Sequence, residues 1–235
     1  MSVLFVTGSG TDIGKTYVTA LLVRQLIAAG QRVMALKPLV SGVPDWREPS
    51  FRQSDTARLL QAQGLALDAA RVDACSPWRF AAPLSPDMAA AKEGRTLALG
   101  EIVNWTRAAI SRAPRGAVVV IEGVGGAMSP ISEDATGLDW LTALGCPALL
   151  VAGSYLGAIS HALTTHAAMT ARGVAVAGVV VNETPDSTVG LDDTAAALQR
   201  FLPGLDVQPL RREAATPLHL LQALMAEARA SEVDG

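Results

Sequence analysis

Short runs of apolar, mostly β-branched residues recur along the chain and define its predicted strands. The runs are VLFV (3–6), RVMAL (32–36), AVVVI (117–121), PALLVA (147–152) and VAGVVV (176–181). Each run is continuous rather than alternating, as in strands that are buried on both faces of a parallel sheet. The segments between them predict helices over about 15–29, 96–111, 159–172 and 192–201. Alternating strands and helices predict an α/β fold, a parallel sheet with helices on both faces.

Two segments depart from this alternation. The hydrophobic pattern is less regular over about residues 44–95. We expect this segment to be a long irregular excursion with short helices rather than a second domain. Residues of about 214–230 predict a terminal helix. A length of 235 residues suits one domain, so we expect residues 1–235 to form a single unit.

The carboxyl ends of the predicted strands carry small, polar or charged residues. The segments that follow the five strands are GSGTDIGKT (8–16), KPLVSG (37–42), EGVGG (122–126), GSYLGAISH (153–161) and NETP (182–185). Ligands of open α/β sheets bind beyond the carboxyl ends of the strands. We therefore expect these five segments to converge on one edge of the sheet and to form the functional site.

The segment from Gly8 to Thr16 predicts a phosphate-binding loop. Its two glycines are one residue further apart than in the usual G-x-x-x-x-G-K-[ST] spacing. Glycines let backbone N–H groups turn towards phosphate oxygens, and the following helix offers its N-terminal dipole. Lys15 would contact the outer phosphates, and Thr16 would place its hydroxyl on Mg²⁺. The sequence thus predicts a P-loop NTPase-type nucleotide-binding domain.

Two carboxylates and a second lysine are candidates for the same edge. Glu122 ends the run AVVVI and is the best carboxylate ligand for Mg²⁺, whereas Asp55 also suits a helix N-cap. Lys37 ends the second predicted strand, where a cation could stabilise charge on a transferring phosphoryl group. The alternative for Lys37 is a strand-end lysine that reaches solvent.

Composition narrows the classes of function. The net charge is −3, aromatic residues make up 4% and no basic tract occurs, so we expect no nucleic-acid partner. No apolar run reaches the roughly 18 residues of a membrane span, and no secretory signal precedes VLFV, which predicts a cytoplasmic protein without membrane contact. Cys75 and Cys146 are far apart and are expected to be reduced thiols.

Seven motifs, in the same order, resemble those of the ATP-dependent dethiobiotin synthetase family, and the resemblance runs from Phe5 to about Leu210. They are FVTGSGTDIGKT (5–16), KPLVSG (37–42), QSD (53–55), SPDMAAAKEG (85–94), EGVGGAMSPIS (122–132), LGAISH (156–161) and NE (182–183). The resemblance implies ATP-dependent carboxylation of 7,8-diaminopelargonate with carbon dioxide or bicarbonate, followed by ring closure to dethiobiotin. The implied intermediates are a carbamate and a carbamic-phosphoric anhydride, and the other products are ADP and phosphate.

The resemblance also implies a role for each matching residue. Lys37 and Lys15 would be the catalytic cations, and Thr16, Asp55 and Glu122 would hold Mg²⁺. The nucleotide would be bound by Asp12, Ile13, Gly14, Lys15, Thr16, Tyr17, Asp55, Glu122, Gly123, Val124, Gly125, Asn182, Glu183, Pro209, Leu210 and Arg211. The substrate would be bound by Thr11, Ser41, Gly157 and Ser160. In the family the active site lies at a homodimer interface, where the start of the LGAISH helix of one subunit receives the substrate carboxylate of the other.

Five positions differ from the residues that the family usually has. They are Gly10 for Asp, Asp12 for Glu, Asp87 for His, Tyr155 for Lys and Ser160 for Asn. The lysines, the threonine and the carboxylate Glu122 are unchanged. The differences therefore concern the carboxylate end of the substrate pocket rather than the phosphoryl chemistry.

Three other functions remain alternatives. A related P-loop ligase would use the same chemistry on a different amine. A partner-controlled ATPase switch usually carries a lysine directly after the first glycine of its phosphate loop, where this chain has Ser9. A metal-delivering GTPase typically uses an Asn-Lys-x-Asp motif for guanine, where this chain has Asn182-Glu183-Thr184-Pro185.

Overall fold

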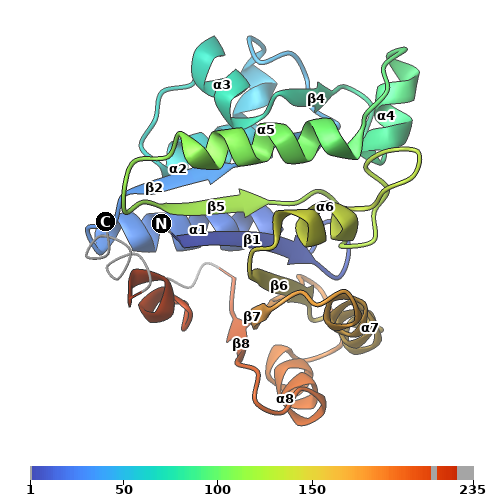
Figure 1. Cartoon of the computed structure of the whole chain (residues 1–235). Coiled ribbons are helices and arrows are strands. Elements are labelled where there is room, and N and C mark those ends of the chain that lie inside the picture. The colour runs from blue at the N-terminus through green and yellow to red at the C-terminus, as the bar shows by residue number, and fades with distance from the viewer. Residues whose placement is uncertain (1, 213–215, 227–235) are drawn as a thin grey trace.

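A parallel sheet forms the centre of the molecule. The computed structural model describes residues 2–212 and 216–226. Within these residues the six-stranded sheet has the order β2 (Val33–Leu36), β5 (Val118–Glu122), β1 (Ser2–Gly8), β6 (Ala148–Gly153), β7 (Val176–Asn182) and β8 (Val207–Leu210), and every adjacent pair is parallel. The predicted α/β fold and its five strands are confirmed, and the strands point their carboxyl ends to one edge (Figure 1).

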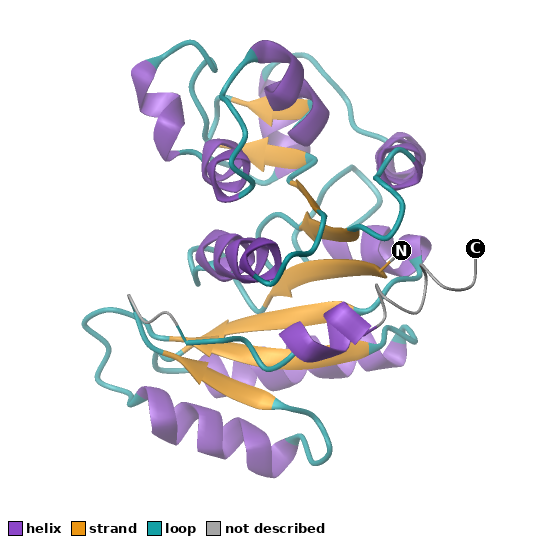
Figure 2. Ribbon diagram, turned by 90° about the vertical axis from the view of Figure 1, so that its left-hand side faces the viewer, coloured by secondary structure: helices purple, strands orange, loops and turns teal. Residues whose placement is uncertain are grey.

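Helices cover both faces of the sheet because successive strand residues point to opposite faces. On one face Leu4 and Val6 pack in the apolar core formed with α1 (Lys15–Ala28) and the helical residues 221–226. On the other face Phe5 packs in the second core, to which α5 (Leu99–Ser111), α6 (Gly137–Leu144), α7 (Ala158–Ala171) and α8 (Leu191–Phe201) contribute residues. Figure 2 shows this layered arrangement from the side.

Around the main sheet, two elements were not predicted from the hydrophobic pattern. Helix α6 is eight residues long and begins at a capping box formed by Thr136 and Asp139, which is a local signal in the sequence. Strand β8 has only four residues and contains Pro209, which lacks a backbone N–H and is tolerated because β8 lies at the edge of the sheet. Helix α5 begins at Leu99 rather than at residue 96, because Ala98 has an extended backbone.

Residues 44–95 contain several short elements. They are η1 (Pro49–Gln53), α2 (Asp55–Ala62), α3 (Ala69–Cys75), β4 (Trp78–Phe80) and α4 (Pro86–Lys92). Strand β3 (Leu39–Ser41) pairs in parallel with β4 in a separate two-stranded sheet. Val40, Phe51, Leu60 and Val72 belong to a small apolar core of their own. This segment lies beyond the β2 edge of the main sheet and brings the start of α2 towards the carboxyl ends of its strands (Figure 1).

The helices are short. The longest of the elements named above, α1 and α7, each have 14 residues. Among the described helices none has the length and apolar character needed to cross a membrane. Of the terminal helix predicted for residues 214–230, residues 221–226 are helical, 216–220 are not, and 214, 215 and 227–230 lie outside the described part.

Candidate active site

The loop between β1 and α1 has the backbone that phosphate binding requires. Asp12 and Gly14 have positive φ angles of 56° and 88°. A Cβ on Gly14 would lie 2.1 Å from Asn182 Nδ2, so a side chain does not fit there. Asn182 Nδ2 donates to the Ile13 carbonyl oxygen at 3.0 Å, and Lys15 Nζ donates to the Gly10 carbonyl oxygen at 3.1 Å. The first bond joins the loop to the end of β7, and the second links the two ends of the loop.

A buried charged cluster lies beside this loop. Lys37 Nζ is 2.7 Å from Glu122 Oε1 and 3.1 Å from Asp55 Oδ2, and it also donates to the Gly123 carbonyl oxygen at 2.8 Å. Thr16 Oγ1 donates to the same Glu122 Oε1 at 2.7 Å. Lys37 is only 2% exposed, so the alternative of a lysine reaching solvent is wrong. Strands β2 and β5 and helices α1 and α2 thus bring together residues that are far apart in the sequence.

The two buried lysines have pKa values that are shifted in opposite directions. Burial, followed by the nearby charge of Lys37, lowers the pKa of Lys15 to about 8. Burial would also lower the pKa of Lys37, but Glu122 and Asp55 outweigh it and raise this pKa above its ordinary value. The charge of Lys37 in turn holds the pKa of Asp55 low in spite of burial. Lys37 is therefore a permanent cation, whereas Lys15 titrates close to neutral pH.

Two adjoining cavities open over the loop and the cluster. The inner cavity, of about 320 Å³, is lined by Thr11, Asp12, Gly14, Lys15, Thr16, Tyr17, Lys37, Val40, Ser41, Asp55, Arg58, Glu122, Val124 and Gly125. The outer cavity, of about 440 Å³, is lined by Asp12, Ile13, Gly14, Tyr17, Arg58, Asn182, Glu183, Thr184, Pro185 and Arg212. Four residues line both cavities, so the two form one continuous cleft: Asp12, Gly14, Tyr17 and Arg58. Their volumes are those of small-molecule binding sites.

Most of the residues predicted for the site lie in this cleft, but Gly123 lines neither cavity, and three residues at the end of β8 do not line them either. Pro209 and Leu210 belong to β8, and Leu210 is fully buried. Arg211 points to α8, where its Nη2 is 2.6 Å from Asp192 Oδ2. The arginines that line the outer cavity are instead Arg58 and Arg212. Arg211 and Arg212 both follow the end of β8 at Leu210, and the Arg212 backbone N–H donates to Glu183 Oε2 at 2.9 Å, which holds Arg212 beside the outer cavity.

The predicted residues of α7 also lie outside the cleft of this chain. Gly157 and Ser160 are exposed at the start of the helix and line neither cavity. The Tyr155 hydroxyl is 2.9 Å from His161 Nδ1, and a Cβ on Gly10 would lie 3.7 Å from the same hydroxyl. Two of the unusual positions, 10 and 155, are therefore neighbours beside the phosphate loop.

Sequence reasoning missed some residues of the cleft, namely Val40, Arg58, Thr184, Pro185 and Arg212. Arg58 could have been found, because it follows Asp55 by three residues on a helix and residues three apart share a helix face. Arg212 had no such signal, since it depends on the direction in which the chain leaves β8.

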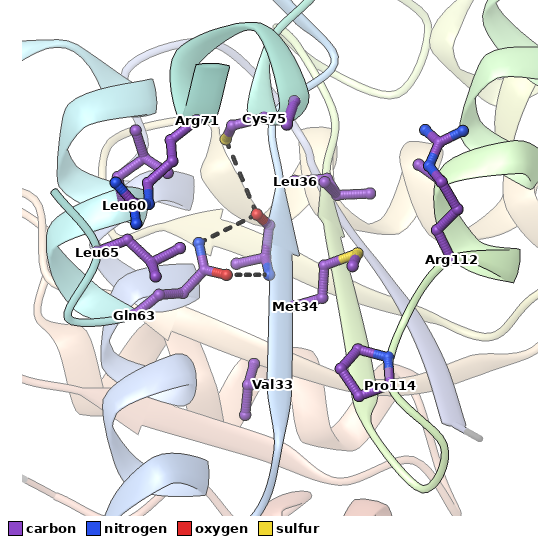
Figure 3. A pocket seen from close by; sticks show the side chains of 13 residues that line it. Val33, Met34, Leu36, Leu60, Gln63, Leu65, Arg71, Cys75, Arg112 and Pro114 are labelled. Carbon is purple, nitrogen blue, oxygen red and sulfur yellow. Dashed lines mark hydrogen bonds between the residues drawn. The ribbon is translucent and has the colours of Figure 1, made fainter. Parts of the chain in front are cut away.

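A further hollow lies at the free edge of β2 and is named the edge cavity. It has a volume of about 260 Å³ and is lined by Val33, Met34, Ala35, Leu36, Leu60, Gln63, Leu65, Arg71, Ala74, Cys75, Ala109, Arg112 and Pro114. In Figure 3 the Gln63 amide faces the backbone of β2, where it accepts from Ala35 N at 2.8 Å and donates to Ala35 O at 3.2 Å. This lining has no carboxylate, lysine or hydroxyl, so the edge cavity lacks the groups that phosphoryl chemistry uses.

The cleft has oxygen donors that suit Mg²⁺. Glu122 Oε2 is buried and makes no hydrogen bond with any described residue, and the Thr16 hydroxyl and Asp55 lie around the same carboxylate. The described residues contain no cluster of three or more His, Cys, Asp or Glu side chains suited to a metal. Mg²⁺ usually takes one or two carboxylates together with water and substrate phosphates, so this donor set fits it.

Fold and cleft together define a P-loop nucleotide-binding protein. The sequence matches the family described as AAA domain over residues 2–217. Among solved structures, the signal recognition particle receptor FtsY from Elizabethkingia anophelis is similar in fold, with a TM-score of 0.50 and 16% identity. The match covers 97% of this chain and 65% of the receptor chain.

Curated relatives identify the family more closely. The ATP-dependent dethiobiotin synthetase BioD of Methylobacterium nodulans is 56% identical over 200 residues, which are 85% of this chain and 89% of that protein. The synthetase of the same name from Phenylobacterium zucineum is 41% identical over 233 residues, covering 97% of each chain. The chain belongs to the ATP-dependent dethiobiotin synthetase family, as the motifs predicted, and is an ATP-dependent ligase of biotin biosynthesis.

Proposed function

We propose that the chain converts 7,8-diaminopelargonate to dethiobiotin. One amine of the substrate adds to carbon dioxide and loses a proton, which gives a carbamate. A carbamate oxygen attacks the γ-phosphorus of ATP, the bond to the β-γ bridging oxygen breaks, and ADP leaves. The second amine attacks the carbonyl carbon of the resulting carbamic-phosphoric anhydride and loses a proton. The C–O bond to phosphate breaks, phosphate departs, and a cyclic urea remains.

The observation that carries this proposal is the buried pair of cations, Lys15 and Lys37, on the inner cavity. Phosphoryl transfer depends mainly on positioning and on compensation of charge. Lys37 is fixed by Glu122, Asp55 and the Gly123 carbonyl, so it needs little rearrangement to stabilise charge on the transferred group. A lysine held in this way at the end of β2 suits an anionic acceptor such as a carbamate. Water is a neutral acceptor, so a second cation would then compensate charge on the transferred phosphoryl group alone.

The nucleotide is proposed to span the two cavities, with its phosphates in the inner one. Thr16, Asp55 and Glu122 would hold Mg²⁺, which would offset charge on the outer phosphates. The base would lie in the outer cavity beside Asn182. Asn182 Oδ1 is buried and makes no hydrogen bond with the described residues, while Nδ2 is used by the loop. A free acceptor at this point suits the exocyclic amine of adenine.

The diamine is proposed to occupy the rest of the inner cavity. Ser41 Oγ donates to the Leu84 carbonyl oxygen at 2.6 Å, so its lone pairs remain available to accept from an amine. Thr11 offers a second hydroxyl, and Val40 and Val124 offer apolar surface for the methylene chain.

The carboxylate end of the substrate is proposed to meet α7 of a second copy. Gly157 is the N-cap of α7, and no side chain caps the N-terminus of this helix. Free N–H groups at a helix start bind carboxylates. Because Gly157 and Ser160 line neither cavity of their own chain, a homodimer would allow them to serve the cleft of the partner.

The reaction can be tested directly with the purified chain. Phosphate release would be measured with ATP, Mg²⁺ and bicarbonate, with and without 7,8-diaminopelargonate, and the product mass read from the same tube. We expect release that depends on the diamine and a product with the mass of dethiobiotin. Release that is independent of the diamine, or a product formed only with another amine, would contradict the proposal.

The homodimer can be tested by mixing two defective variants. Lys37→Met would remove a catalytic cation, and Ser160→Asp would repel the substrate carboxylate at the start of α7. If the cleft uses α7 of the partner, refolded or co-expressed mixtures form heterodimers with one intact site, and activity returns. Each variant alone is the control. A mixture that proves to be dimeric but no more active than its parts would contradict shared sites, and a monomer in sedimentation would contradict the dimer itself.

A further inference from the structure

We propose that Arg58 binds the α-phosphate of the nucleotide at the junction of the two cavities. The proposal rests on the binding of ATP in this cleft and adds a contact that the sequence motifs did not predict. Arg58 is the one cationic residue that lines both the inner and the outer cavity among the described residues. Lys15 and Lys37 line only the inner cavity, and Arg212 lines only the outer one.

The position of Arg58 is fixed by α2. The Ser54 side chain caps this helix by accepting from Ala57 N at 3.2 Å, and Arg58 N donates to Ser54 O at 3.0 Å. One turn before Arg58 the helix carries Asp55, which pairs with Lys37 in the charged cluster. The next residue, Leu59, is fully buried in the core that α1 shares. The same helix therefore supplies one residue to the cluster and one to the junction.

The guanidinium of Arg58 is available for a ligand. Arg58 is exposed, and its side chain makes no hydrogen bond or ion pair with the part of the chain that the structure describes. In the proposed binding mode the phosphates lie in the inner cavity and the base in the outer one, so a nucleotide that spans both would place its α-phosphate at the shared boundary. Arginine suits such a contact because its planar fork can donate two parallel hydrogen bonds to a phosphate.

One nearby carboxylate offers a competing role. Asp12 lines the same junction. In the competing role, Arg58 neutralises the charge of Asp12 and makes no contact with the nucleotide. This would reduce the repulsion between Asp12 and the phosphates. The two roles differ in what happens when Asp12 is made neutral, so Asp12→Asn is part of the test.

The test compares nucleotides that differ only in their phosphates. Binding of adenosine, AMP, ADP and ATP would be measured by calorimetry for the wild-type chain, Arg58→Ala and Arg58→Lys. We expect Arg58→Ala to raise the Kd of AMP, ADP and ATP by about tenfold or more each, as for loss of a charge-assisted hydrogen bond. The Kd of adenosine should stay unchanged. Arg58→Lys should recover only part of the loss. In turnover, KM for ATP should rise while kcat stays within about twofold.

Arg52→Ala is the matched control, because Arg52 is also an exposed arginine but lines neither cavity. The proposal would be overturned if Arg58→Ala bound all four ligands as the wild-type chain does. It would also be overturned if the affinity for adenosine fell as much as the affinity for the nucleotides. A loss that vanishes when Asp12→Asn is added would also overturn it, in favour of neutralisation. Product formation by the wild-type chain is measured separately, so failure of the ligase reaction would not be mistaken for failure of this contact.

Discussion

The inner cavity and the edge cavity share two elements of the chain but differ in nearly every physical property. Strand β2 lines the edge cavity with Val33 and Leu36 and then delivers Lys37 to the inner one. Helix α2 delivers Asp55 and Arg58 to the inner cavity and Leu60 to the edge cavity. The inner cavity contains buried opposite charges that are paired. The edge cavity contains apolar side chains, two arginines and an amide whose hydrogen bonds are satisfied, and it has no carboxylate. Location on the same elements therefore does not decide function, whereas the direction of each side chain does.

The effect of burial on ionisation shows the same contrast. In the edge cavity, burial raises the pKa of Cys75 to about 11, and the thiol stays neutral and unreactive. In the inner cavity, Glu122 and Asp55 reverse the effect of burial on Lys37 and keep it charged. A buried charge is tolerable only when it is paired and hydrogen-bonded. We infer that the stability of the inner cavity depends on mutual compensation, and that of the edge cavity on packing and backbone satisfaction.

The largest expected effect comes from breaking the compensation in the inner cavity. Lys37→Met should lower kcat by about 10²–10³, as for loss of one preorganised charge-stabilising group. It should also destabilise the fold by about 3–5 kcal/mol, because Glu122 would remain buried without its partner. Steady-state kinetics and urea unfolding measure the two effects.

A double variant separates these two consequences. Adding Glu122→Gln to Lys37→Met removes the uncompensated charge, so most of the lost free energy of unfolding should return while kcat stays low. If Lys37→Met alone kept kcat within tenfold of the wild-type value, the catalytic role of Lys37 would be wrong. If the double variant were less stable than the single one, the two residues would not compensate each other.

A substitution in the lining of the edge cavity should change the stability of the protein and not its turnover. Gln63→Leu removes both hydrogen bonds to the backbone of Ala35 and leaves those groups of an edge strand without the amide partner. The expected loss is about 1–3 kcal/mol in the free energy of unfolding, with kcat and KM unchanged. Gln61→Leu is the matched control, because Gln61 is exposed on α2, the helix that Gln63 ends. It should have little effect on stability or on turnover. A fall in kcat for Gln63→Leu would show that the edge cavity and the active site are coupled.

The difference between local sequence signals and tertiary contacts explains how much of the fold and of the site could be predicted from the sequence. Continuous apolar runs identified five strands, and the residues after them identified the edge of the sheet, because both signals are local. The pairing of Lys37 with Asp55 could not be predicted from spacing, since it depends on the fold of residues 44–95. Arg211 was placed in the nucleotide site, but it contacts α8, because the direction of a side chain beyond a short edge strand depends on tertiary packing.

The smallest expected effect concerns the proton on Lys15. Its pKa of about 8 in the free chain means that Lys15 is mostly neutral above that pH, whereas a bound phosphate would stabilise the ammonium form. ATP binding should therefore take up close to one proton per site near pH 9, and the Kd should rise towards tenfold per pH unit above about 8. Below about pH 7 the residue is already charged, so this proton uptake should disappear. Calorimetry in buffers of different ionisation enthalpy measures the uptake, and Lys15→Arg, which stays charged, should show none. Equal uptake in both chains would assign the proton to another group, and no uptake in either would mean that Lys15 is charged before the nucleotide arrives.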